Sequence, residues 1–303
     1  MPKASVDIGS NSVLLLVVDD AGRRLHDEAR VVGLGKGLGD RGLFQPERMD
    51  AAEAALADYV ATATGLGVEP WSIKAVATSA ARRAMNAETF FAKLKRTLGL
   101  RVRIITGEEE ARLTWLGAQV DLPHTHTPEP RIVVDLGGGS TEVVVGQAGE
   151  VRQRTSLEFG TVRLTERFLT EDAEGRVLPE SVPPLTEYLD VEIRRIPFAL
   201  PADCQVVGVA GTVTTLAAMR RGLETYEGDL VHGMALSKHD LQDFIDRLAK
   251  ATRAERQVMA AISPKRADLL FAGATVLHRL LVNLRADHLL VSDRGLRYGV
   301  LAA

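Results

Sequence analysis

An internal repeat restricts the fold of this chain more than any other sequence feature. The segment Asp7-Ile-Gly-Ser-Asn-Ser12 is matched by Asp135-Leu-Gly-Gly-Gly-Ser140, and a valine-containing apolar run follows each copy, at 13–18 and at 143–145. Each copy is typical of a strand, a tight turn of small residues and a second strand. With 303 residues, the chain is long enough for two domains with separate cores. We expect one copy of the hairpin in each domain.

The segments around the two copies alternate between strand and helix patterns. We predict strands at 4–8, 73–77, 102–105, 132–136, 141–146, 150–157, 206–209 and 287–291, and helices at 46–64, 88–98, 107–119, 183–197, 237–249 and 265–284, with three more starting at 161, 211 and 294. This alternation predicts an α/β fold with mostly parallel, covered sheets.

Three prolines between 121 and 130 indicate an interdomain connection or a surface loop. We expect an N-terminal domain over 1–122 and a C-terminal domain over 123–293, with a cleft between them. The last helix, 294–303, is expected to pack back on the first domain.

Composition argues for an ordinary globular protein. The chain is 46% hydrophobic and 25% charged, with a formal net charge of -3, so no global charge attracts nucleic acid or a membrane. Cys204 is the only cysteine, which excludes an intrachain disulfide and a cysteine zinc cage. We see no signal peptide or membrane-spanning stretch and expect a cytoplasmic protein. A homodimer is left open.

The two turns are candidate phosphate-binding loops. Backbone N–H groups of residues with small side chains can point together into an anion site, and serine hydroxyls add donors. The candidates are Ser10, Asn11 and Ser12 in the first copy, and Gly137, Gly138, Gly139 and Ser140 in the second. A single loop of this kind would more often be a plain β-turn. Two matched loops, each preceded by an aspartate, favour phosphate.

Carboxylates beside the loops suggest a divalent cation. Asp135 ends one predicted strand and Glu142 begins the next, so both can reach the same turn, and Asp7 is a third candidate. Mg²⁺ takes one or two carboxylates together with phosphate and water oxygens. Taken alone, Glu142 is equally well explained as a solvated strand residue.

Other candidates lie at the starts of predicted helices. Glu108, Glu109 and Glu110 open the helix after Gly107, and one of them could activate water, although acidic residues are common in a first turn. Spacing does not choose among the three. Arg82 or Arg83 could bind phosphate after the strand at 73–77. Gly211 and Thr212 start a helix whose N-terminus is a candidate anion site. The glycine-rich 33–39 segment has neither Rossmann nor Walker A spacing.

Eight ordered segments resemble the exopolyphosphatase and guanosine pentaphosphate phosphohydrolase (Ppx/GppA) family. They are the two hairpin segments, the second extended to Glu142, together with 77–82, 107–113, 159–166, 208–215, 265–273 and 292–299. The match therefore runs from the first strand to the last helix. The family belongs to the acetate kinase, sugar kinase, heat-shock chaperone and actin superfamily. One departure is Ala210, where the family often has glycine.

The resemblance implies two ribonuclease-H-like (actin-like ATPase) domains and hydrolysis of a terminal phosphoanhydride. It implies Glu110, directly before Ala-Arg-Leu, as the catalytic glutamate, Arg82 as a phosphate contact, and Asp135 and Glu142 as positions for Mg²⁺ or for orienting water. Inorganic polyphosphate is the first expected substrate, with short chains preferred because the chain resembles the two-domain form. Guanosine pentaphosphate is second. An ATP-dependent kinase or nucleotide-gated scaffold is an alternative from another class.

Overall fold

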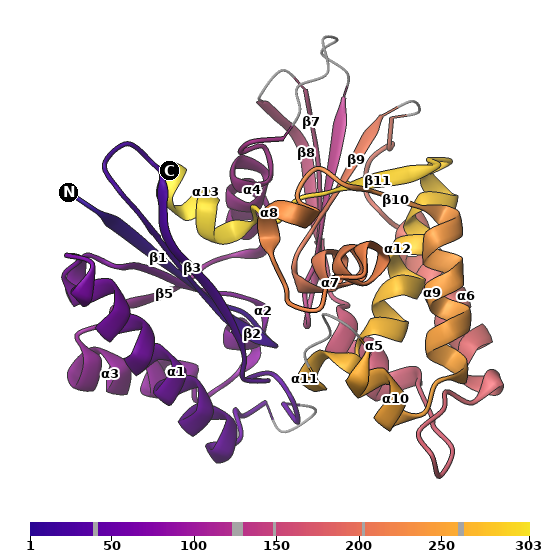
Figure 1. Ribbon diagram of the computed structural model, residues 1–303, viewed down its shortest axis with the longest axis horizontal. Coiled ribbons are helices and arrows are strands. Elements are labelled where there is room, and N and C mark those ends of the chain that lie inside the picture. Colours follow the sequence, from indigo (N-terminus) through magenta and orange to yellow (C-terminus); the bar gives the residue numbers. More distant parts are fainter. Residues whose placement is uncertain (39–41, 123–129, 148–149, 202–203, 260–263) are drawn as a thin grey trace. The chain divides into compact units, whose positions relative to one another are not determined.

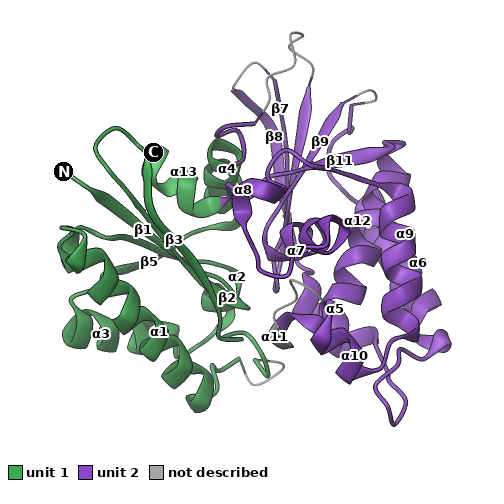
Figure 2. Ribbon diagram, viewed as in Figure 1, with its two compact units in different colours: residues 1–117, 296–303 green, residues 118–295 purple. Residues whose placement is uncertain are grey.

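The computed structural model describes residues 1–38, 42–122, 130–147, 150–201, 204–259 and 264–303. They form two compact units, one of residues 1–117 with 296–303 and one of residues 118–295 (Figure 2). Each unit holds one sheet with helices, which confirms the predicted α/β class. Most of the predicted connection at 121–130 lies outside the described residues.

Unit 1 contains a five-stranded sheet in the order β3-β2-β1-β4-β5. Its strands are β1 (Lys3–Ile8), β2 (Ser12–Val18), β3 (Arg24–Val31), β4 (Lys74–Ala77) and β5 (Val102–Ile104). The first three strands pair antiparallel, whereas β4 and β5 run parallel to β1. The first copy of the repeated segment forms the turn between β1 and β2, as the sequence predicts.

Helices cover both faces of the unit 1 sheet (Figure 1). Helices α1 (Pro46–Gly65) and α3 (Ala87–Leu98) pack on one face, and α4 (Gly107–Ala118) and α13 (Leu296–Ala302) on the other. Helix α1 starts with proline at its first turn and buries Ala52, Leu56, Tyr59 and Ala63, a spacing that forms one apolar stripe. The short helices α2 (Ser79–Arg83) and η1 (Pro70–Ser72) lie in the connections around β4.

Unit 2 repeats this plan with one additional strand. Its sheet order is β10-β11-β9-β6-β7-β8, with strands β6 (Arg131–Leu136), β7 (Thr141–Gln147), β8 (Glu150–Leu157), β9 (Gln205–Val209), β10 (Ala235–Ser237) and β11 (His288–Val291). Strands β6, β7 and β8 form an antiparallel meander, and β9 and β11 continue in parallel from β6. Removing β10 leaves the strand order and directions of unit 1.

The core of unit 2 is built around α12 (Leu270–Leu284), which is buried along most of its length. It packs against α5 (Thr161–Phe168), α6 (Val182–Arg194), α7 (Gly211–Arg221) and α9 (Lys238–Lys250). The remaining described helices are η2 (Pro179–Ser181), α8 (Gly228–Val231), α10 (Arg253–Val258) and α11 (Pro264–Ala267).

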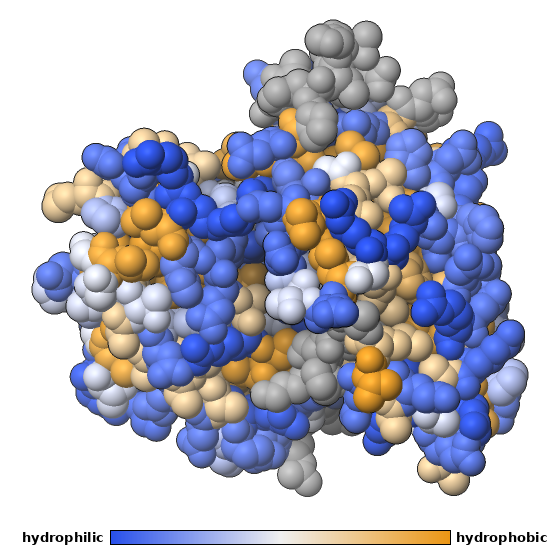
Figure 3. All heavy atoms as spheres, viewed as in Figure 1, coloured by the Kyte–Doolittle hydropathy of each residue, from blue (hydrophilic) through white to orange (hydrophobic). Residues whose placement is uncertain are grey.

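Two expectations about the elements are wrong. The sheets are mixed rather than mostly parallel, because each repeated hairpin continues into a third antiparallel strand. The predicted helix 265–284 is divided into α11 and α12. On the face seen in Figure 3, hydrophilic residues predominate and hydrophobic ones occur in small separate areas. No helix in the described part of the chain combines the length and apolarity needed to cross a membrane.

Candidate functional site

The turn of unit 1 is held by hydrogen bonds that orient its backbone amides. The Gly9 N–H donates to the Ser12 carbonyl at 2.9 Å. The Ser10 and Asn11 carbonyls accept from backbone N–H groups of the 32–35 segment at 2.7–3.0 Å. In a trans peptide the N–H points opposite to the carbonyl that precedes it. The N–H groups of Asn11 and Ser12 therefore point away from the 32–35 segment, as an anion site requires.

Arg82 and Glu110 form a buried ion pair in unit 1. The Arg82 Nη1 donates to Glu110 Oε2 at 2.7 Å and to the Ile105 carbonyl at 3.0 Å. The side chains are 22% and 8% exposed, respectively. Arg82 Nη2 is buried and has no hydrogen-bond partner among the described residues. This nitrogen is well suited to an oxygen of a bound anion, because a buried donor without a partner is costly.

The structure distinguishes the three glutamates that spacing could not. Glu108 is exposed. Both carboxylate oxygens of Glu109 accept hydrogen bonds from Arg103 Nη1, at 2.6 and 2.7 Å. Glu110 is 6% exposed and lies one turn into α4, where its N–H donates to the Thr106 carbonyl. Of the three, Glu110 alone shares an ion pair with the candidate phosphate contact Arg82.

The turn of unit 2 repeats the geometry of the first. The Gly137 N–H donates to the Ser140 carbonyl at 3.1 Å, matching Gly9 and Ser12. The carbonyls of Gly137 and Gly138 accept from N–H groups at the start of α5 at 2.9–3.4 Å, and Arg163 Nη1 donates to the Gly139 carbonyl at 3.4 Å. The N–H groups of Gly138, Gly139 and Ser140 therefore point away from α5.

The close approach of α5 to this loop depends on Gly160. A β-carbon at Gly160 would lie 2.5 Å from the Gly138 carbonyl carbon and 2.6 Å from the Gly137 oxygen. Any side chain there would push the helix away from the loop carbonyls that it binds. No role for this glycine is predicted from the sequence.

Asp135 and Glu142 lie directly opposite each other on β6 and β7. Glu142 is 1% exposed, and its Oε1 accepts a hydrogen bond at 2.8 Å from Ser156, its neighbour on β8. The burial of Glu142 excludes a solvated strand residue. Two facing carboxylates next to a phosphate loop are a donor set that fits Mg²⁺ with substrate and water oxygens. Ser156 was not found from the sequence, because only the sheet register places it beside Glu142.

Two features that the sequence did not predict lie at the start of α7: a strained backbone at Ala210 and the cationic side chain of Arg266. Ala210 precedes the helix with φ 79° and ψ 169°, a conformation that is nearly restricted to glycine. Thr212 is buried. The guanidinium of Arg266 lies over Gly211, where a β-carbon would be 2.6 Å from its central carbon, and Nη1 reaches Thr215 Oγ1 at 3.5 Å. A cation beside the positive end of a helix favours an anion there.

The predicted residues are divided between the units. Unit 1 brings Arg82 and Glu110 together, and unit 2 brings together Asp135 and Glu142. Asp7 lies in unit 1, opposite Leu14 rather than opposite an acid. Within the described ranges, no three His, Cys, Asp or Glu side chains are grouped as a metal cluster. Asp7 as a third ligand therefore remains a prediction.

Comparison with known proteins gives consistent matches along the chain. Residues 16–303 match the model of the Ppx/GppA phosphatase family. The sequence is 37% identical to exopolyphosphatase 2 of Mycobacterium tuberculosis, over 98% of this chain and 96% of the relative. Two crystal structures are similar. The Aquifex aeolicus Ppx/GppA family member has a TM-score of 0.81 at 35% identity, covering 99% and 96% of the chains. An exopolyphosphatase from Cytophaga hutchinsonii has a TM-score of 0.89 at 28% identity, covering 100% and 97%.

Proposed function

This chain belongs to the Ppx/GppA phosphatase family, and from that premise we propose that it releases the terminal phosphate of inorganic polyphosphate. The observation that carries the proposal is the buried pair of Arg82 and Glu110, which joins a candidate phosphate contact to a candidate general base at 2.7 Å. Phosphate-binding groups alone would equally suit a kinase. A buried carboxylate next to a phosphate contact can activate water, and a hydrolase requires such activation.

Phosphate binding is assigned to groups on both units. The N–H groups of the turn after β1 and of the glycine loop after β6 would bind phosphate oxygens, together with Arg82 and the start of α7 at Gly211 and Thr212. Such preorganised donors stabilise the charge that develops on the transferred group. Because these contact points are few, we propose that short chains already fill them and are preferred.

Glu110 is assigned the role of general base. Its carboxylate would accept a proton from the attacking water as the water oxygen bonds to the terminal phosphorus, and the bridging oxygen leaves with the shortened chain. The ion pair with Arg82 fixes the carboxylate in one orientation. Arg82 Nη2 would gain its missing partner from a phosphate oxygen, so substrate binding and orientation of the base are linked.

Asp135 and Glu142 are assigned to a divalent cation. The bound cation would offset the negative charge of the phosphate oxygens. Ser156 donates a hydrogen bond to Glu142 Oε1, which fixes the orientation of this carboxylate. Asp7 is proposed as an additional ligand or as a residue that orients water.

A conservative substitution of the base tests this assignment. Glu110→Gln keeps the size of the side chain but removes the proton acceptor, so we expect kcat to fall about 10²–10⁴-fold while substrate affinity changes little. The matched control is Glu109→Gln, which changes the neighbouring residue and loses only the pair with Arg103. It should keep nearly full turnover. Equal losses in the two variants, or full activity in Glu110→Gln, would show that Glu110 is not the base.

A further inference from the structure

Ser79 is a buried polar residue of unit 1 that none of the roles assigned above uses. It is the first residue of α2, which follows β4, and it is 2% exposed. Its hydroxyl oxygen is buried and has no hydrogen-bond partner among the described residues. A buried hydroxyl in this state is unfavourable, because the water that it loses on folding is not replaced.

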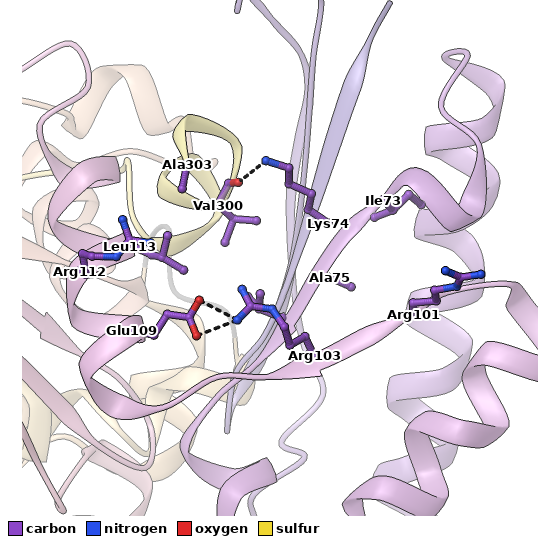
Figure 4. Close-up of a pocket in the computed structure, with 11 residues that line it drawn as sticks. Ile73, Lys74, Ala75, Arg101, Arg103, Glu109, Arg112, Leu113, Val300 and Ala303 are labelled. Carbon is purple, nitrogen blue, oxygen red and sulfur yellow. Dashed lines mark hydrogen bonds and ion pairs between the residues drawn. The ribbon is translucent and has the colours of Figure 1, made fainter.

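Two other polar groups of unit 1 show the usual arrangement. Ser5 is fully buried, and its hydroxyl donates to the Arg297 carbonyl at 2.7 Å. On the sheet face that α4 and α13 cover, Figure 4 shows Arg103 and Glu109 pointing toward each other, and they are hydrogen-bonded at 2.6 and 2.7 Å. Most buried polar groups in folded proteins are bonded in this way, so the hydroxyl of Ser79 is an exception.

The surroundings of Ser79 are those of the candidate site in unit 1. The Thr78 N–H donates to the Ile8 carbonyl at 3.3 Å, and the Ile105 N–H donates to the Ala77 carbonyl at 3.0 Å. Helix α2 therefore begins where the parallel strands β1, β4 and β5 end. This carboxyl-terminal edge of a parallel sheet is where α/β proteins bind their ligands.

The start of α2 also lies next to the turn after β1. A β-carbon at Gly35 would lie 3.1 Å from the Ser10 β-carbon and 3.3 Å from the Ala80 β-carbon. The same backbone segment thus contacts both the turn and the residue that follows Ser79. The hydroxyl is therefore close to the candidate phosphate-binding loop of this unit.

Arg82 lies on the same side of α2 as Ser79, because residues three apart share one face of a helix. Arg82 Nη1 donates to Glu110 and to the Ile105 carbonyl, and Ile105 is bonded to Ala77, which precedes α2. The Arg82 side chain thus extends back toward the start of the helix. Arg82 Nη2 is a second buried donor without a partner among the described residues.

We propose that the Ser79 hydroxyl donates a hydrogen bond to the phosphate group that Arg82 binds. A phosphate group has several oxygens that accept hydrogen bonds, so one group satisfies both donors at once. A hydrogen bond to a charged acceptor is also stronger than one to a neutral acceptor. The proposal rests on the proposed function, because it adds a contact to the same substrate, and it leaves Glu110 as the base.

Ser79→Ala tests this contact by two measurements on the full chain. Loss of a hydrogen bond to a charged group should weaken tripolyphosphate binding about 10–100-fold. We expect this loss as a higher KM, with kcat changed less than about threefold. The unfolding temperature should stay equal or rise, because the variant removes a buried hydroxyl that has no partner in the protein.

Two further variants serve as controls. Ser5→Ala removes an equally buried hydroxyl that does have a partner. It should lower the unfolding temperature and leave tripolyphosphate affinity within about twofold. Ser79→Cys keeps the approximate size of the side chain but offers only a weak donor, so it should reproduce the loss of affinity seen in Ser79→Ala.

Calorimetric titration of tripolyphosphate into Glu110→Gln, with and without Ser79→Ala, separates this contact from the proposed function. Weaker binding in the double variant supports the contact even if the unmodified chain releases no phosphate, which would refute hydrolysis alone. Unchanged affinity, in a chain that hydrolyses tripolyphosphate, would overturn the contact and leave hydrolysis standing. The contact would also be overturned by an absence of tripolyphosphate binding, or by a lower unfolding temperature in Ser79→Ala, which would show a structural role.

Discussion

At the scale of single residues, Ala210 is the clearest sign that function constrains this chain. Its backbone angles, φ 79° and ψ 169°, are sterically unfavourable for any residue with a β-carbon. It lies directly before Gly211 and Thr212, the candidate phosphate contacts at the start of α7. Strain of this kind persists only when surrounding structure imposes it. The resemblance gave glycine as the common residue here, and the backbone explains why.

Replacing Ala210 with glycine should therefore stabilise the protein. Relief of the strain contributes about 1–3 kcal/mol, of which about 0.5–1 kcal/mol is offset by the greater freedom of glycine in the unfolded chain. We expect a higher free energy of unfolding in urea. The control is Ala249→Gly, in the regular helix α9, which should be destabilised by about 1 kcal/mol. Destabilisation of both variants would mean that Ala210 carries no strain.

Residue-scale features also show where sequence reasoning stopped. The loops and the aspartates before them were recognisable because their spacing repeats along the chain, and Glu142 because it begins the strand after the second loop. The choice of Glu110 over Glu108 and Glu109 rested on resemblance alone, because the distinguishing partners Arg82 and Arg103 lie elsewhere in the sequence. Ser156 and Gly160 could not be found for the same reason. Their roles depend on strand register and on helix approach, which no local pattern encodes.

At the scale of elements, strongly patterned segments were predicted well, and the edge strands β3 and β10 were missed. Strands β1, β6 and β9 and helices α1 and α3 match the predicted ranges within a few residues. Strand β3 escaped because it is an edge strand of largely polar, partly exposed residues. Strand β10 has only three residues. The mostly parallel sheets were expected from the alternation of strands and helices, and the antiparallel pairing of β3 and β8 departs from that expectation.

Helices α13 and α4 meet at a close backbone contact in unit 1. A β-carbon at Gly299 would lie 1.7 Å from the Leu113 carbonyl oxygen, so the two helices meet backbone to backbone. Arg297 and Tyr298 bind Asp27 of β3, and Ser5 of β1 donates to the Arg297 carbonyl. Helix α13 is thus held by α4 on one side and by β1 and β3 on the other. Helix α4 is the element that positions Glu110.

Gly299→Ala should consequently destabilise the protein by about 1–3 kcal/mol, because the added methyl forces α13 away from α4. Thermal unfolding would measure this loss. Gly295→Ala is a matched control, since a β-carbon at Gly295 meets nothing within 4 Å. If Gly299→Ala unfolded at the same temperature as Gly295→Ala, the helices would not be in the contact described here.

At the scale of the whole molecule, the sequence repeat at 7–12 and 135–140 corresponds to a repeated fold. In both units a meander of three antiparallel strands is followed by two parallel strands. In both turns the glycine N–H donates a hydrogen bond to the serine carbonyl three residues later. The units differ in chemistry: the position opposite the aspartate is Leu14 in one and Glu142 in the other. The facing carboxylates Asp135 and Glu142 thus lie beside the copy in unit 2, whereas the candidate base Glu110 lies in unit 1.

The central claim is acceptor-independent hydrolysis of polyphosphate, and orthophosphate release tests it most directly. The assay compares tripolyphosphate, long-chain polyphosphate, guanosine pentaphosphate and ATP, each with Mg²⁺ and again with a chelator. We predict release from polyphosphate without any added acceptor, fastest from tripolyphosphate and lost on chelation because the carboxylate pair is then left without its cation. Release that required a second substrate, or that was faster from guanosine pentaphosphate or ATP than from polyphosphate, would contradict the account.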